Sequence, residues 1–199
     1  MKSMIKDAAI LFAITLISGL LLGVVYEVTK EPIAVQKALR KNKACKEVFQ
    51  EAVDFRALEL SVPETLEAGE KAAAAINGVS EAVSEDGAVL GYVLDITTHE
   101  GYNGDIQFTM GIKMDGTVNG ISLLSIAETP GLGMKAEDVL KPQFAGKKVG
   151  LFAYTKTGAA TPDQIDAISG ATITTNALVN GVNTGLDFFK TELGGGKNE

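Results

Sequence analysis

The sequence predicts an α+β domain with a mainly antiparallel sheet flanked by helices, preceded by a single N-terminal transmembrane helix. Two observations predict this fold. The 19 residues from Ala8 to Tyr26 carry no charge. Apolar residues then alternate with a period of two between Ala88 and Ile126, and helical patterns lie before and after this region rather than inside it. That order is typical of antiparallel hairpins and argues against a doubly wound parallel sheet.

The uncharged run is long enough to cross a bilayer as a helix. At a rise of ~1.5 Å per residue it spans roughly 28 Å, close to the ~30 Å thickness of the hydrocarbon core. A cleaved signal peptide is the alternative, but the run exceeds the roughly 7 to 15 residues of a signal core. No Ala-x-Ala site closes it either. We therefore expect an N-terminal tail at residues 1–7 and an uncleaved transmembrane helix at residues 8–28.

A basic stretch follows the predicted membrane helix. Between Lys30 and Lys46, six Lys and Arg residues stand against one acid, Glu31. Positive charge marks the cytoplasmic side of membrane proteins, yet large domains are translocated despite such charges, so charge alone leaves the orientation open. The stretch could contact anionic lipid head groups or form a solvated stem.

The remaining chain is acidic and poor in metal-binding residues. Residues 47–199 hold 10 Lys and Arg against 22 Asp and Glu, which argues against nucleic-acid binding. Cys45 and His99 are each the single residue of their type. One cysteine cannot build an intramolecular disulfide, an iron–sulfur cluster or a Cys-rich zinc site, and no metal site is predicted. We expect His99 to be an ordinary strand-end or loop residue.

Helical apolar spacing resumes after the membrane segment. It extends from Ile33 to Phe55 and predicts a stem, which we assign to residues 29–60. A short Ala-rich helix is predicted from Lys71 to Ile76. The folded domain is assigned to residues 61–199.

Three strands are predicted in the middle of that domain. Turn signals separate them, at Asp86-Gly87, Asn103-Gly104 and Asp115-Gly116. The last pair lies between alternating apolar segments and predicts a hairpin. The predicted strands are Ala88 to Thr97, Asp105 to Met114 and Val118 to Ile126.

A hydroxyl-rich segment, Asp166-Ala-Ile-Ser-Gly-Ala-Thr-Ile-Thr-Thr175, precedes a helix that apolar spacing predicts from about Thr175 to Thr191. Thr172 then lies just ahead of the first turn, where unpaired N–H groups and the helix dipole favour an anion. Gly170 and Ala171 leave room for an anion near the backbone. In the alternative interpretation, one of the hydroxyls of Ser169, Thr172, Thr174 or Thr175 merely caps the helix.

A glycine-rich loop, Glu128-Thr-Pro-Gly-Leu-Gly-Met-Lys135, follows the third strand. Gly131, Gly133 and Ala136 match the loose dinucleotide fingerprint G-x-G-x-x-A. That fingerprint needs a βαβ unit, whereas the strands here are predicted to be antiparallel. NAD or FAD binding by this route is therefore disfavoured, and the residues could equally shape a turn.

Two of these segments resemble signatures of a known family. Ser169-Gly-Ala-Thr172 is similar to the flavinylation motif of FMN-binding domains, and Glu128-Thr-Pro-Gly-Leu-Gly133 to their second signature. Together with the anchor and the turn at residues 101–104, the resemblance covers nearly the whole chain in order. The chain resembles the G subunits of Rnf complexes; the related C subunits of sodium-pumping quinone reductases are usually longer.

The resemblance implies a covalent flavin. Thr172 would carry FMN through a phosphoester, attached by a flavin transferase that uses FAD and a divalent metal. Asp166 would belong to the motif that the transferase reads. The residues that would shape the attachment loop are Ser169, Gly170 and Ala171, and those near the isoalloxazine ring would be Glu128, Thr129, Gly131 and Leu132.

The resemblance also implies an electron-carrying role without independent substrate turnover. The chain would belong to a cell-membrane complex that couples electron transfer between ferredoxin and NAD to translocation of Na⁺ or H⁺. The other Rnf subunits would be its partners, and its flavin domain would lie on the extracytoplasmic side. Three alternatives remain open: a membrane-anchored flavin-binding or sensing domain outside any ion pump, the C subunit of a sodium-pumping quinone reductase, and a structural domain whose hydroxyl segment is only a helix cap.

Overall fold

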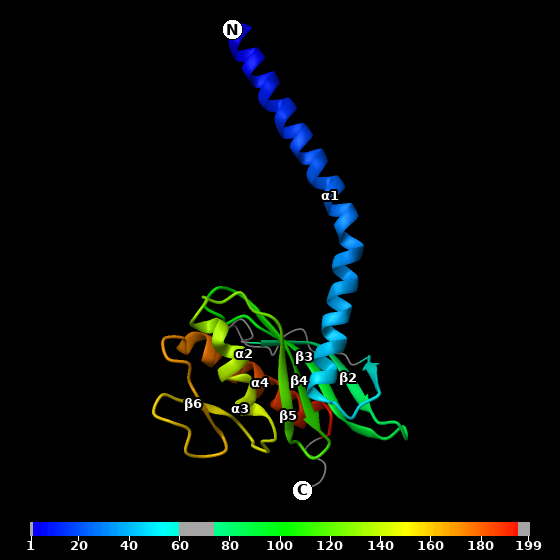
Figure 1. Ribbon diagram of the computed structural model, residues 1–199, viewed down its shortest axis with the longest axis vertical. Coiled ribbons are helices and arrows are strands. Elements are labelled where there is room, and N and C mark those ends of the chain that lie inside the picture. The colour runs from blue at the N-terminus through cyan, green and yellow to red at the C-terminus, as the bar shows by residue number, and fades with distance from the viewer. Residues whose placement is uncertain (1, 60–73, 195–199) are drawn as a thin grey trace. The chain divides into compact units, whose positions relative to one another are not determined.

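The structure is a computed structural model that describes residues 2–59 and 74–194 (Figure 1). The chain divides into two compact units, Met1–Arg40 and Lys41–Glu199, and the first helix contributes to both. In chain order the elements are α1 (Lys2–Val48), β1 (Asp54–Leu58), β2 (Ala74–Val83), β3 (Val89–Thr98), β4 (Ile106–Lys113), β5 (Val118–Ser125), η1 (Gly133–Lys135), α2 (Ala136–Val139), α3 (Lys141–Phe144), β6 (Ala153–Thr155), β7 (Gln164–Asp166) and α4 (Thr172–Glu192).

The first unit is one apolar helix. Within the described residues, α1 is the one helix long and apolar enough to cross a membrane. Its large apolar side chains, such as Phe12, are exposed. The hydroxyls of Thr15 and Thr29 donate to backbone carbonyls one turn earlier, those of Leu11 at 3.1 Å and Val25 at 2.8 Å. A helix that satisfies its own hydroxyl groups in this way suits a lipid environment.

The second unit is built on an antiparallel sheet with the strand order β1-β2-β3-β4-β5. Each of the three predicted strands is confirmed to within one residue at its ends. The predicted hairpin joins β4 to β5: Lys113 N–H donates to the Thr117 carbonyl at 2.8 Å, and Gly116 has a φ of 83°. The expected α+β class is therefore confirmed.

The helical stem is shorter than predicted. α1 ends at Val48, where the side-chain amide of Asn119 donates to the Val48 carbonyl. Residues Asp54–Leu58 form the edge strand β1, which pairs with β2. The apolar spacing predicts too long a helix, because the conformation of this segment is decided by pairing with β2 and not by local propensity.

The predicted Ala-rich helix at Lys71–Ile76 is wrong where the structure describes it. Ala74 begins β2 and lies opposite Thr98 of β3, while residues 71–73 lie outside the described residues. Alanine exceeds most ordinary residues in helix propensity by at most about 0.7 kcal/mol per residue. Pairing with β3 therefore overrides it.

One face of the sheet is covered by α4. Apolar side chains of β3 and β4, Ile96, Phe108 and Met110 among them, form the main core with the apolar face of this helix. The helix approaches closely because it presents glycines: a Cβ on Gly181 would lie 2.9 Å from the Phe108 ring, and one on Gly185 would lie 2.7 Å from Met110 Sδ. Core packing thus fixes the position of α4.

The other face of the sheet is covered by the C-terminal end of α1. Cys45 and Phe49 form a smaller apolar cluster with Val93 of β3. Two strand glycines permit this contact, because a Cβ on Gly91 would lie 2.8 Å from Phe49 Cζ, and one on Gly111 would lie 3.1 Å from Phe49 Cε2. Burial raises the pKa of the Cys45 thiol, so this cysteine behaves as a small apolar side chain.

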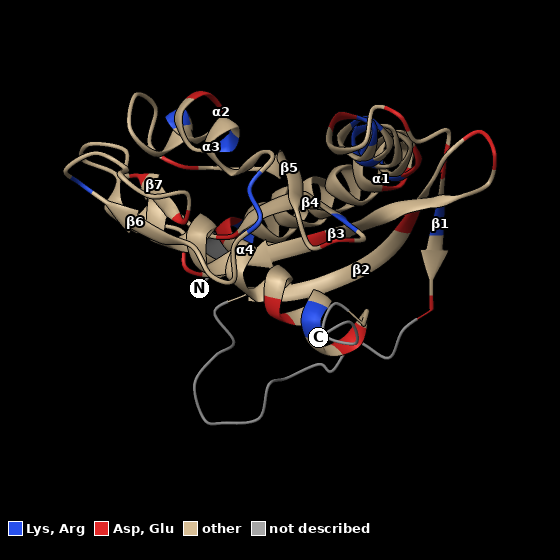
Figure 2. Ribbon diagram, turned by 90° about the horizontal axis from the view of Figure 1, so that it is seen from below, with Lys and Arg blue, Asp and Glu red and all other residues tan. Residues whose placement is uncertain are grey.

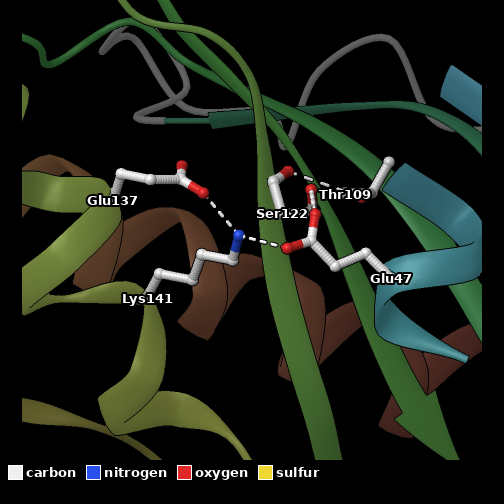
Figure 3. Close-up of polar contacts among 5 residues, drawn as sticks. All are labelled: Glu47, Thr109, Ser122, Glu137 and Lys141. Carbon is white, nitrogen blue, oxygen red and sulfur yellow. Dashed lines mark hydrogen bonds and ion pairs between the residues drawn. The ribbon is translucent and has the colours of Figure 1, made fainter. Parts of the chain in front are cut away.

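A cluster of charged and polar side chains joins the end of α1 to α3 and β5 (Figure 3). Lys141 Nζ pairs with the carboxylates of Glu47 and Glu137, and Ser122 Oγ donates to Glu47 Oε2 at 2.5 Å. Burial opposes the charge of Glu47, but hydrogen bonds from Lys141 and Ser122 outweigh it and hold the pKa of Glu47 below its usual value. Burial likewise opposes the charge of Lys141, yet its two carboxylate partners raise its pKa.

The remaining elements of the second unit are short. β6 and β7 form a separate parallel pair, which the sequence pattern does not predict. Figure 2 shows acidic residues spread over several elements of the second unit, with basic residues among them.

Gly181→Ala should destabilise the protein. Replacing a helical glycine by alanine ordinarily gains up to about 1 kcal/mol, but overpacking a rigid core costs about 1–3 kcal/mol. The added methyl would meet the fully buried ring of Phe108 at 2.9 Å, so overpacking should prevail. Denaturant unfolding of the full chain in detergent, followed by circular dichroism, measures the change. Gly78→Ala, whose new Cβ would meet only Lys41 Nζ at 4.0 Å, is the control; equal stability of the two variants would contradict the expectation.

Glu47→Gln should lower stability at neutral pH and have less effect in acid. A carboxylate whose pKa is depressed by folding stabilises the protein above its unfolded pKa, and this stabilisation is lost as the pH falls through the folded pKa. The reference value for Glu47 is 4.5, so the gap between wild type and variant should close below about that pH. Unfolding curves between neutral and acid pH test this. The exposed Glu85→Gln provides the control, and a gap independent of pH would refute the assignment.

Candidate functional site

Three segments that are distant in the sequence meet at a cavity of about 480 Å³. This volume lies within the range of roughly 300–1,000 Å³ common for small-molecule sites. The segments are the turn between β3 and β4, the loop after β5 and the start of α4. Their lining residues are Tyr102 from the turn, Glu128, Thr129, Leu132 and Gly133 from the loop, and Gly170, Ala171, Thr172, Ile173 and Thr174 from the helix start.

The start of α4 offers unpaired backbone donors to this cavity. The first helical hydrogen bond joins Thr175 N–H to the Ala171 carbonyl at 3.1 Å, so Thr172 is the first residue of the helix and does not lie ahead of it. Among the described residues, the N–H groups of Thr172, Ile173 and Thr174 have no hydrogen-bond partner. No described side chain caps this end, and its first turn contains no acid. Such a helix end favours a bound anion.

Two of the hydroxyl groups near this helix start are engaged within the protein. Thr175 Oγ1 donates to the Ala171 carbonyl at 2.9 Å and accepts from Ile168 N–H at 3.2 Å. Thr174 Oγ1 donates to Glu128 Oε2 at 2.9 Å. The exposed fractions of Thr174 and Thr175 are 1% and 0%. Neither hydroxyl is available to a molecule in the cavity.

The two other hydroxyl residues, Ser169 and Thr172, differ in position. Ser169 is exposed and does not line the cavity. Thr172 is half-buried and does line it. Its hydroxyl has no hydrogen-bond partner within the described part of the chain, so a molecule in the cavity could reach it.

Glu128 ties the three segments together. The residue as a whole is 5% exposed. Oε1 accepts a hydrogen bond from Asn103 N–H in the β3–β4 turn at 3.2 Å, and Oε2 accepts one from Thr174 in α4. The Asn103 side chain also donates to the Ala127 carbonyl at 2.8 Å. A single carboxylate thus fixes the spacing of all three walls.

Glycines give the walls their shape. Gly131 and Gly170 have φ values of 78° and 77°, a conformation that side chains disfavour. Gly133 is required for a different reason, because a Cβ there would lie 2.6 Å from Thr174 Oγ1 and 2.7 Å from Glu128 Cβ. The loop can therefore pass directly over the Glu128–Thr174 pair.

Most of the residues singled out by the sequence come together at the cavity. Six line it: Glu128, Thr129, Leu132, Gly170, Ala171 and Thr172. Three do not: Gly131, Ser169 and Asp166. Asp166 ends β7, where its carboxylate accepts a hydrogen bond from Ala159 N–H at 2.5 Å.

Four lining residues are missing from the sequence-based set: Tyr102, Gly133, Ile173 and Thr174. Each lies within or directly beside a recognised segment, so proximity to the motifs is the signal that could have identified them. Tyr102 is 68% exposed and Ile173 is 51% exposed. With Leu132, they give the cavity an apolar rim that suits a flat aromatic molecule.

Other parts of the described chain offer less chemistry. A second cavity, of about 370 Å³, is lined by residues 47–51 and by Leu90, Lys113 and Asn119, and contains none of the predicted site residues. His99 follows β3, is exposed and pairs with Asp105 at 2.9 Å, as expected for a residue at a strand end. The described residues contain no group of three or more His, Cys, Asp and Glu side chains placed to hold a metal.

Comparison with known families agrees with this geometry. Residues 101–187 match the FMN-binding domain family, and residues 1–48 match the N-terminal region of RnfG. The first match contains all three walls of the cavity.

Individual relatives extend the similarity over nearly the whole chain. The chain is 33% identical to the G subunit of the Na⁺-translocating ferredoxin:NAD⁺ oxidoreductase complex of Acetobacterium woodii, over 95% of this chain and 93% of that protein. It is 30% identical to the proton-translocating counterpart of Clostridium ljungdahlii, over 96% and 97%. The crystal structure of Shewanella oneidensis NqrC has a TM-score of 0.51 and 21% identity, covers 72% of this chain and 70% of that one, and shares the fold.

Gly133→Ala should disrupt the cavity wall and destabilise the protein. The added Cβ would lie 2.8 Å from Glu128 Oε2 and closer still to Thr174 Oγ1, so the loop must shift or the Glu128–Thr174 bond must break. Overpacking of this kind costs about 1–3 kcal/mol. Thermal unfolding followed by circular dichroism measures the loss. Gly150→Ala is the control, because its Cβ would meet only the flexible Lys190 Nζ at 3.7 Å; an unchanged Tm for Gly133→Ala would argue against the tight contact.

Proposed function

This chain belongs to the G subunit family of ion-translocating oxidoreductase complexes, and on that premise we propose that it carries covalent FMN on Thr172 as an electron-transfer component of an Rnf complex. The complex would couple electron transfer between ferredoxin and NAD to movement of Na⁺ or H⁺. Both ions occur in the names of the relatives, so the coupling ion stays open between them.

The cavity fits FMN. Its volume suits a molecule of that class, and its exposed apolar rim offers a surface for the flat isoalloxazine ring. The unpaired N–H groups at the start of α4 suit a phosphate, which remains an anion after esterification. When bound, FMN would supply the redox chemistry, since flavins exchange electrons singly or in pairs.

Attachment at Thr172 rests on one observation. Of the four hydroxyls near the start of α4, the Thr172 hydroxyl alone lines the cavity without a hydrogen bond to another described residue. Thr174 and Thr175 are buried and bonded, and Ser169 lies outside the cavity. A flavin transferase would form the phosphoester. Asp166, which orders the backbone at Ala159, would belong to the segment recognised by that enzyme.

The chain's own contribution is to hold the flavin rather than to transfer protons. Leu132 and Ile173 would flank the ring, the α4 N–H groups would bind the phosphate, and Glu128 would keep the three walls together. No side chain is needed as a general acid or base. The apolar core of α1 offers no ionisable path, so ions would cross through partner subunits.

The membrane assignment follows from α1. This helix would anchor the chain in the cell membrane, among lipid and the other subunits of the complex. We propose that the flavin domain lies on the extracytoplasmic side, as the family resemblance implies. A covalent bond makes sense there, because a dissociated cofactor would be lost from the cell.

Thr172→Ala should abolish flavin attachment while leaving the fold intact. The substitution removes the one hydroxyl near the start of α4 that lines the cavity without a described hydrogen-bond partner, and the half-buried position of Thr172 predicts little loss of packing. The full chain, produced with a flavin transferase, would be examined by fluorescence in denaturing gels and by intact mass. Thr191→Ala, which removes an exposed hydroxyl near the other end of α4, is the matched control and should retain the flavin. A fluorescent Thr172→Ala band would refute the attachment site, and a dark wild-type band would refute covalent FMN altogether.

Purification from native membranes separates the leading proposal from a flavin domain outside any pump. A tagged wild-type chain should bring other subunits of an ion-translocating complex with it. A flavin-bearing chain that purifies alone under mild detergent would favour the sensing alternative.

A further inference from the structure

Glu128 is a buried carboxylate in the wall of the flavin cavity. Both of its oxygens accept hydrogen bonds, from Asn103 N–H at 3.2 Å and from the Thr174 hydroxyl at 2.9 Å. Two donated hydrogen bonds are what an ionised carboxylate, which is an acceptor only, requires at its two oxygens. Glu128 therefore places a negative charge at the cavity.

That charge has no cationic partner in the described part of the chain. No described Lys, Arg or His forms an ion pair with Glu128, and every other side chain that lines the cavity is neutral. The donors that hold it, a backbone amide and a threonine hydroxyl, carry no net charge. Among the described groups that line the cavity, only the positive end of the α4 dipole offsets it. Glu128 is therefore the one charged side chain among the described residues that line the cavity.

The carboxylate is also held still. A Cβ on Gly101 would lie 2.9 Å from Glu128 Oε1, and one on Gly133 would lie 2.8 Å from Oε2, so two backbone segments enclose it. Enclosure at 5% exposure keeps solvent from reorganising around the charge. Electrostatic interactions are stronger at such a site than in water.

Building on the proposed function, we propose that Glu128 sets the reduction potential of the flavin by placing a fixed negative charge beside it. Electrons supplied by the complex's donor add negative charge to the flavin. The carboxylate repels that added charge and so raises the free energy of the reduced form relative to the oxidised form. The flavin is thereby made a stronger reductant, as suits a carrier fed by ferredoxin, a low-potential donor.

Glu128→Gln provides the test because it removes the charge and can keep both contacts. The Gln oxygen can accept from Asn103 N–H, and its amide can donate to Thr174 once that hydroxyl rotates. The full chain, loaded by a flavin transferase, would be titrated by spectroelectrochemistry in detergent. We expect the midpoint potential of Glu128→Gln to shift to more positive values than the wild type.

Two controls separate charge from structure. Glu85→Gln removes an exposed charge from the β2–β3 turn, at the opposite end of β3 from Tyr102, and should leave the potential unchanged. Thr174→Val removes the hydroxyl but keeps the carboxylate, and should not reproduce the positive shift. Equal potentials for wild type and Glu128→Gln, with flavin attached to both, would overturn the inference.

A second variant covers the case in which Glu128→Gln fails to accept flavin. Thr129→Lys adds a cation at an exposed lining position next to Glu128 and leaves the carboxylate's own contacts in place. Its potential should also shift to more positive values, and the absence of that shift would overturn the inference. Absence of flavin from the wild-type chain would instead reject the proposed function, so the two failures are distinguishable.

Discussion

The close packing of α4 against the sheet is the contact on which the cavity depends. Gly181 brings the helix so near to Phe108 that a single added methyl would lie 2.9 Å from the ring. Because α4 is continuous from Thr172 to Glu192, fixing its middle also fixes its first turn. The unpaired N–H groups are therefore positioned by the core of the domain, and the loops only complete the site around them.

The same sheet must accept a helix on its other face. Phe49, at the end of α1, packs over Gly91 and Gly111, while Lys41 forms an ion pair with the buried Asp95 of β3 at 3.0 Å. The strands β3 and β4 therefore have two buried faces, which explains why burial is nearly continuous along β4 although its large apolar side chains alternate with Gln107, Thr109 and Gly111. Two-sided burial leaves little freedom for the strands to slip in register.

Much of this architecture follows from local sequence signals. Asp115-Gly116 predicts its hairpin because the turn needs a positive φ, and the spacing of Leu178 and Val182 predicts α4. The motifs also predict six of the ten residues that line the cavity. Local patterns succeed where the conformation is decided by near neighbours.

Features decided by distant contacts escaped prediction. Ala74 joins a strand because β3 is available to pair with it, and β1 depends on β2 in the same way. The hydrogen bond from Thr174 to Glu128 joins residues 46 positions apart. No local pattern could therefore show that the Thr174 hydroxyl is hydrogen-bonded within the protein and that the Thr172 hydroxyl has no described partner. The parallel pairing of β6 with β7 is likewise a tertiary result.

The helix start and the loop opposite it differ in how firmly they are held. Amide hydrogens in the buried middle of α4 can exchange with solvent only when the core opens, whereas the loop around Leu132, 40% exposed, can open locally. A group anchored on the first residue of α4 would thus be attached to a helix whose middle is packed in the core. The group would keep its position when the loop opens locally. Opening of the loop during contact with a redox partner would therefore not release the cofactor.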